Sequence, residues 1–144
     1  MKILTKLEII DETVKFYSKD TTRRSKKGVL CLYNSGDGRY CAVGRYLTTK
    51  VKNEILVQDC NDSDLEGLVC FLTKTTYKYM MSSLQKILKP SVRGHNPQFW
   101  VELQWLHDTS EYWCETGLTQ LGELEVKKLK TKWSCQNNAT IGNF

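Results

Sequence analysis

Cys41, His107 and Asp108 have the side chains with the clearest catalytic potential in this sequence. A cysteine after a glycine-rich turn can have a lowered pKa and act as a thiolate nucleophile, with a histidine as its base. His107 and Asp108 are neighbours on a predicted helix, so their side chains point about 100° apart and cannot easily serve one thiol. We therefore expect Cys41 to be a core residue and the other two to close a helix C-terminus. They would be catalytic only in a Cys-dependent hydrolase or transferase.

Cysteine and histidine side chains could also hold a metal ion. Two thiols, Cys31 and Cys41, with two imidazoles, His95 and His107, would make a tetrahedral site. The sequence has no Cys-x-x-Cys pair and its histidines lack zinc-finger spacing, so we expect neither a metal nor a cofactor. The 6 cysteines are expected to be reduced, because the first residues show no export signal and disulfides belong to oxidising compartments.

Phosphate or nucleotide binding is the third chemistry that the residues support. Arginine offers a planar fork to phosphate, glycine lets backbone N–H groups approach an anion, and aromatic rings can stack on a base. No P-loop motif occurs. The alternative is that the glycines form turns, the tryptophans form core and the arginines lie on the surface. The predicted ligand-binding residues are Arg39, Arg45, Arg93, His95, Tyr33, Trp100 and Trp113.

The formal net charge of +5 is unevenly distributed. Basic residues gather in segments 15–27 and 127–132, and the remainder is mildly acidic. Basic segments can contact the phosphates of a nucleic acid. A solvated loop and a solvated helix face are the favoured interpretation, so nucleic-acid binding is a weaker alternative.

Apolar spacing predicts the elements that position these residues. Apolar side chains recur every three or four positions over residues 3–17, which predicts an amphipathic helix. This stripe would also suit a second copy, so a homo-oligomer is an alternative. Two β-prone runs around an Asn/Gly/Asp/Gly turn predict a hairpin, and residues 48–62 are ambiguous. The expected elements are a helix at 2–18, a hairpin at 29–45, helices at 63–73, 76–89, 97–108 and 119–133, and a flexible tail at 134–144.

The fold class that follows is α+β, a single compact domain over residues 1–133 that is mostly helical with a small β-hairpin or sheet near residues 29–45. A length of 144 residues with 40% hydrophobic residues suits one globular domain. No apolar run approaches the roughly 20 residues of a membrane span. The start of the chain lacks the apolar centre of a signal peptide, which favours a cytoplasmic location.

Several short motifs then follow one another in order. They are Cys31-x-Tyr33, Asp37-Gly38, Cys41-Ala-Val-Gly-Arg45, Lys89-Pro90, Arg93-Gly94-His95, Phe99-Trp100, Leu103-Gln104-x-Leu-His107-Asp108, Trp113 and Gly117-Leu118-Thr119. Over roughly residues 20–130 this order resembles a family of small cytosolic proteins of tailed bacteriophages and prophages. Members share a Cys-Ala-(Val/Ile)-Gly core and a later Leu-Gln-x-x-His-Asp helix. Their acidic Pro-Asp segment is replaced here by Thr48-Thr-Lys50, so no role of that segment is carried over.

The resemblance implies a phage setting but no particular activity. Together with the weak catalytic set, it favours a host-takeover or counter-defence protein that acts by binding in the host cytoplasm. We expect such a protein to sequester a small phosphorylated or nucleotide signal without turnover. The alternative is a protein-binding inhibitor of a host enzyme.

Overall fold

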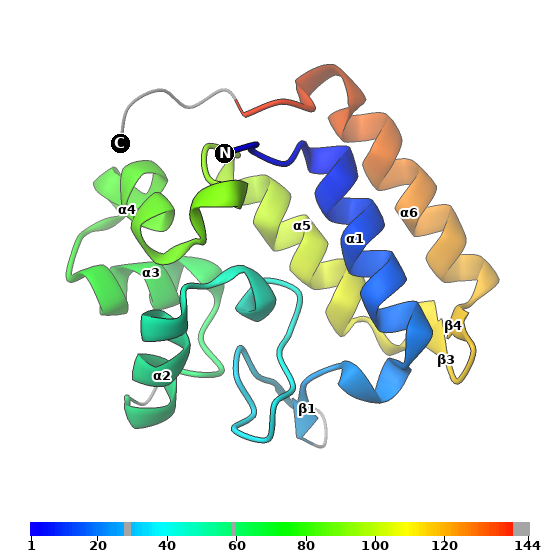
Figure 1. Cartoon of the computed structure of the whole chain (residues 1–144), viewed down its shortest axis with the longest axis horizontal. Coiled ribbons are helices and arrows are strands. Elements are labelled where there is room, and N and C mark those ends of the chain that lie inside the picture. The colour runs from blue at the N-terminus through cyan, green and yellow to red at the C-terminus, as the bar shows by residue number, and fades with distance from the viewer. Residues whose placement is uncertain (28–29, 59, 140–144) are drawn as a thin grey trace.

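Three long helices lie side by side and form the frame of the computed structural model, which describes residues 1–27, 30–58 and 60–139 (Figure 1). They are α1 (Lys6–Lys19), α5 (Pro97–Asp108) and α6 (Gln120–Trp133). The shorter helices α2 (Thr49–Val57), α3 (Leu65–Thr73) and α4 (Met80–Ile87) flank this frame. The 3-10 turns are Thr21–Arg23, Gly44–Tyr46, Tyr77–Tyr79, Pro90–Val92, Ser110–Tyr112 and Ser134–Gln136.

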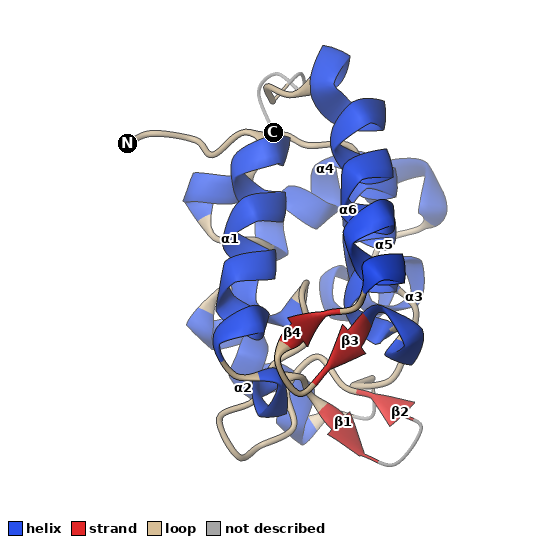
Figure 2. Cartoon of the chain, turned by 90° about the vertical axis from the view of Figure 1, so that its right-hand side faces the viewer, coloured by secondary structure: helices blue, strands red, loops and turns tan. Residues whose placement is uncertain are grey.

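Two small antiparallel ladders lie near the end of the frame where α1 ends and α6 begins (Figure 2). One joins β1 (Lys26–Lys27) to β2 (Leu30–Cys31), and the other joins β3 (Trp113–Cys114) to β4 (Gly117–Leu118). The α+β, mostly helical, single-domain fold is confirmed. In the part of the chain that the structure describes, no helix has the length and apolar character to cross a membrane.

Local capping determines where the main helices begin. The Thr5 hydroxyl accepts from the Glu8 N–H, and the Glu8 carboxylate accepts from the Thr5 N–H, which is a complete capping box. Asn96 caps α5 just ahead of Pro97, as its sequence predicts. Asp64 caps α3 through the Gly67 N–H, one residue later than the Ser63 pattern suggests. These caps satisfy backbone N–H groups that a helix leaves unpaired.

The predicted hairpin at 29–45 is wrong in its position. The ladder ends at Cys31, whose partner is Lys26, so Cys31 and Cys41 do not face each other across two strands. Residues 32–43 instead form a loop in which Tyr40 makes isolated bridges to Asn34 and to Arg24. The Asn34 side chain bonds its own loop and the Lys52 carbonyl, so polar side chains replace the strand ladder that β-propensity favours.

After this loop the chain packs closely against itself at Gly44. A Cβ atom on Gly44 would lie 1.9 Å from the Tyr33 carbonyl oxygen, so only glycine allows this approach. The 3-10 turn Gly44–Tyr46 follows directly. A second difference lies at residues 77–79, where a 3-10 turn precedes α4 and shortens the predicted helix at 76–89.

The apolar stripe of α1 faces the chain's own core. Ile10 and Tyr17 are fully buried, so the central part of this stripe is not open to a second copy. The first residues of the predicted flexible tail are also fixed against α1. The Asn137 carbonyl and side chain accept from the backbone N–H groups of Lys6 and Leu7, at 2.8 Å each. Residues 140–144 of the predicted tail lie outside the described part of the chain.

Candidate functional site

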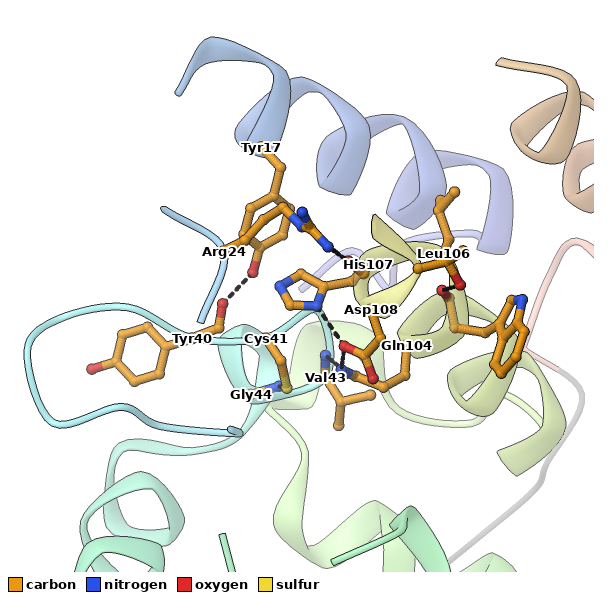
Figure 3. A network of polar contacts seen from close by, with 12 residues as sticks. Tyr17, Arg24, Tyr40, Cys41, Val43, Gly44, Gln104, Leu106, His107 and Asp108 are labelled. Carbon is orange, nitrogen blue, oxygen red and sulfur yellow. Dashed lines mark hydrogen bonds and ion pairs between the residues drawn. The ribbon is translucent and has the colours of Figure 1, made fainter. Parts of the chain in front are cut away.

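Two of the motifs named above, Cys41-Ala-Val-Gly-Arg45 and Leu103-Gln104-x-Leu-His107-Asp108, meet at Gln104 (Figure 3). Its Oε1 accepts from the backbone N–H of Val43 at 3.0 Å, and its Nε2 donates to Asp108 Oδ1 at 2.6 Å, one turn further along α5. The same Asp108 oxygen lies 2.7 Å from His107 Nδ1. One amide side chain therefore joins the loop that contains Cys41 to the C-terminal turn of α5.

Cys41 lies inside this junction. The side chain is buried, and the Gly44 N–H donates to its Sγ at 3.2 Å. Burial raises the pKa of the Cys41 thiol well above its ordinary value, because a thiolate is poorly solvated in the core. The thiol is therefore protonated at neutral pH, and a thiolate mechanism has no support from this geometry.

His107 and Asp108 close the C-terminus of α5. The His107 ring is fully buried and packs edge-on against Tyr17, with ring centroids 4.8 Å apart. Its carbonyl accepts from Arg24 Nε at 2.9 Å and from Arg24 Nη2 at 2.5 Å. A guanidinium thus satisfies a carbonyl that the helix end leaves unpaired. Tyr17 in turn donates to the Tyr40 carbonyl at 2.5 Å, so the network ties α1 to both segments (Figure 3).

A cavity of about 500 Å³ opens beside this junction. It lies within the usual size range of ligand pockets. Three carboxylates, an amide, two thiols and two aromatic side chains give it a mixed acidic and apolar character. Its lining residues are Cys31, Tyr33, Cys41, Asp62, Ser63, Asp64, Leu65, Val101, Gln104, Trp105 and Asp108.

The Tyr33 side chain lines this cavity and is only 5% exposed. Burial raises the pKa of Tyr33, and the neighbouring Cys41, Asp108 and Asp64 raise it further. The hydroxyl therefore stays protonated and lies within the electrostatic reach of two carboxylates that line the same cavity.

The other predicted ligand-binding residues do not gather at this cavity. Trp100 and Trp113 are buried in the core, where they cannot stack on a ligand. Arg39 pairs with Asp37 in the exposed loop. His95 and Arg93 bond the carbonyls of Leu4 and Leu88. Arg45 lies against α1, where it pairs with Glu12. Of the predicted set only Tyr33 lines the cavity, because the remaining side chains serve packing or local hydrogen bonds.

The tetrahedral metal set is not assembled either. Cys31 and Cys41 line the cavity, whereas His95 bonds the N-terminal segment and His107 packs on Tyr17. Within residues 1–27, 30–58 and 60–139, no group of three or more His, Cys, Asp or Glu side chains is arranged to hold a metal ion.

The sequence prediction missed the acidic and exposed side chains of the cavity. Asp62 and Asp64 precede α3, and Trp105 lies on α5 with 62% of its surface exposed. The sequence contains one weak indication of this cavity, because the spacing of residues 101, 104, 105 and 108 places them on one face of a helix. The approach of Asp64 to that face depends on tertiary packing. Comparison with known protein families, curated proteins and solved structures finds no match to this chain.

Proposed function

We propose that this protein acts by binding another protein, and that the cavity beside Gln104 accepts a basic side chain, preferably arginine, from the partner. The observation that carries the proposal is the combination of Asp62, Asp64 and Asp108 with the exposed Trp105 at one cavity. The chain as a whole has a net charge of +5, whereas the charged residues that line this cavity are all acidic.

The cavity matches the chemistry of a guanidinium group. Carboxylates accept paired hydrogen bonds from arginine, and an indole face attracts the same cation. The Tyr33 hydroxyl, from another lining residue, can accept or donate one further hydrogen bond. Three carboxylates would repel a phosphate, so this cavity does not support the phosphorylated ligand that the sequence favours.

An apolar strip beside the cavity supports a protein partner over a small cation. Val101 lines both the acidic cavity and a second hollow of about 400 Å³ that also contains Tyr77 and Met81. These three side chains and Trp105 are among the exposed large hydrophobic residues. Aromatic residues and methionine are enriched at protein interfaces. A strip of them next to an acidic cavity suits a segment with an arginine beside apolar side chains.

In the phage setting that the sequence resemblance implies, such a protein would be an inhibitor of a host protein. Binding requires no turnover. A partner that inserts arginine would lose that anchor when the cavity carboxylates are neutralised, and anchors of this kind dominate interface energetics.

A fluorescence titration tests this function. Trp100, Trp113 and Trp133 are buried, so acrylamide quenching reports mainly on Trp105. A 12-residue peptide that alternates arginine and leucine should protect Trp105 from quenching, whereas the peptide with glutamate in place of arginine should not. The double variant Asp62→Asn/Asp64→Asn keeps the α3 cap, because asparagine caps as well as aspartate. It should bind the arginine peptide about tenfold more weakly.

The matched control is Glu111→Gln/Glu115→Gln, which removes two exposed carboxylates that do not line the cavity. It should leave the affinity unchanged. Equal weakening in both double variants would mean non-specific charge attraction and would overturn the proposal. Equal protection by N-acetyl-arginine amide at the same arginine concentration would reassign the cavity to a small cation. Self-association abolished by the aspartate variants would reassign it to a second copy.

A further inference from the structure

A separate group of basic side chains surrounds Arg45, away from the residues of the acidic cavity. A cleft of about 220 Å³ is lined by Lys15, Lys19, Arg23 and Arg45, with Glu12 as the one carboxylate among its lining residues. Phe16 forms its apolar wall. The cations come from α1, from the turn after it and from the turn at Gly44–Tyr46, so tertiary packing brings like charges together.

The two arginines are held in place by the same ring. The guanidinium carbons of Arg45 and Arg23 lie 3.8 Å and 4.5 Å from the Phe16 ring centroid. Arg23 Nη1 also donates to the Phe16 carbonyl at 3.1 Å, and Arg45 Nη2 pairs with Glu12 at 3.0 Å. Their geometry is therefore set before any ligand arrives, which lowers the ordering cost of binding.

Two further lysines, Lys52 and Lys89, lie near Arg45 but are not among the lining residues of the cleft. The Lys52 Nζ lies 4.3 Å from the Tyr40 ring centroid. The Lys89 backbone N–H donates to the Tyr46 carbonyl at 2.8 Å, which positions Lys89 beside the Arg45 turn. Burial first, and then the neighbouring Lys89 and Arg45, lower the pKa of Lys52 to about 8.

Helix stabilisation accounts for only part of this arrangement. A lysine at the end of α1 interacts favourably with the helix dipole, which explains Lys19. It does not explain why Arg23, Arg45, Lys52 and Lys89 approach from other elements. Like charges at close range raise the free energy of the folded chain unless an anion offsets them.

We infer that this basic group is a binding site for a small molecule with a phosphoryl or pyrophosphoryl group. Arg23 and Arg45 would bind its oxygens through their planar forks, and Lys15, Lys19, Lys52 and Lys89 would neutralise its remaining charge. The cleft has room for a phosphoryl group rather than for a whole nucleotide, so the rest of the molecule would lie along the surface. This site is independent of the protein-binding function proposed above.

Pyrophosphate is the probe for the first test. Isothermal titration calorimetry and ³¹P NMR, at an ionic strength balanced with NaCl, should show binding of one pyrophosphate per chain with no change in its chemical form. Arg23→Gln should weaken binding at least about tenfold, the loss expected when a charge-assisted hydrogen bond is removed. Arg45→Lys keeps the charge and the stacking stem but loses the fork, and it should also weaken binding.

The matched control is Lys127→Gln/Lys128→Gln. These lysines belong to a different hollow on α6, and their loss lowers the net charge more than either test variant does. The control should bind pyrophosphate as the wild type does. Equal weakening in the control, or no binding by the wild type at 10 mM pyrophosphate (on the order of the weakest specific affinities), would overturn the proposal.

Proton uptake gives a second, independent readout. With a pKa of about 8, Lys52 is roughly half protonated at pH 8. A bound anion raises this pKa, so Lys52 should take up a fraction of a proton when pyrophosphate binds at pH 8, in addition to any proton that the pyrophosphate itself exchanges. Titrations in two buffers of different ionisation enthalpy measure the net proton exchange, and the difference between the wild type and Lys52→Gln isolates the share of Lys52. Equal proton exchange in the two proteins would contradict the placement of the anion beside Lys52.

A nucleic acid is the competing source of phosphate. A 20-nucleotide oligothymidine should bind no more tightly than pyrophosphate at 150 mM NaCl. Tighter binding that falls steeply with salt and is weakened by Lys127→Gln/Lys128→Gln would show a distributed nucleic-acid surface. That result would overturn the small-molecule site.

Discussion

Replacing Gln104 with leucine tests the junction between the Cys41 loop and α5. Gln104→Leu keeps the side-chain volume but removes the acceptor of the Val43 N–H and the donor to Asp108. Val43 is fully buried, so its N–H would be left without a partner at a cost of about 1–3 kcal/mol. Loss of the bond to Asp108 adds about 1 kcal/mol. We expect the free energy of unfolding to fall by about 2–4 kcal/mol.

Thermal and urea denaturation measure this loss. For a chain of 144 residues, the usual entropy of unfolding per residue converts the expected loss into a fall in Tm of roughly 7–13 °C. Gln98→Leu is the control, because Gln98 is exposed on the same helix and its replacement should change stability by less than about 0.5 kcal/mol. If Gln104→Leu costs no more than this control, the amide does not hold the loop and the reasoning is refuted.

Three further predictions concern reactivity, backbone packing and pH. The first uses pulse alkylation of the native protein with iodoacetamide, followed by peptide mass spectrometry. Cys114 should react first because it is exposed and hydrogen bonds lower its pKa, and Cys41 should react only after denaturation. Early labelling of Cys41 would contradict its burial. Gly44→Ala should lower the free energy of unfolding by more than about 3 kcal/mol, because the new Cβ would lie 1.9 Å from a carbonyl oxygen. In the control Gly38→Ala the Cβ meets no atom within 4 Å, so the loss should be only the strain of a φ of +89°, about 1 kcal/mol. Equal losses for the two variants in urea denaturation would refute the close approach. Burial lowers the pKa of His95, so the folded chain favours the neutral ring. The neutral His95 ring contributes to stability above about pH 6.5, and this contribution should be lost as the pH falls through the lower pKa of the folded chain. NMR titration of the ring should show a pKa below that of the unfolded chain, and a higher value would refute this account.

The contact between the Cys41 loop and α5 gives a structural role to the two motifs that meet at Gln104. Gln104 satisfies a buried backbone group, and the His107 carbonyl accepts the Arg24 guanidinium. Cys41, Gln104 and Asp108 also line the acidic cavity, and Asp108 is the charged residue among these three. The two motifs therefore describe how a loop and a helix are joined, and function is better sought in the side chains around them.

Local signals in the sequence predicted the fold class and every main helix except α2, which lies in the segment 48–62 that the sequence left ambiguous. Capping residues such as Asn96 and the spacing of apolar side chains act within a few positions, so α5 begins and ends where the sequence predicts. The aromatic content predicted a core, and Trp100 and Trp113 do belong to it. Their burial is also why these two rings do not line the cavity beside Gln104. The same ring can stack on a base or fill a core, and its residue type does not distinguish the two.

Tertiary structure alone decided the sites. The bond between Gln104 and Val43 joins residues 61 positions apart, and Arg45 reaches Phe16 from a different element. Such contacts depend on how helices pack and on how loop side chains compete with strand pairing, and neither is encoded by a local period. Asp64 has the residue type of an ordinary helix cap. It becomes part of an acidic cavity only because the fold brings the start of α3 to the same space as α5, where its carboxylate and that of Asp108 are both lining groups.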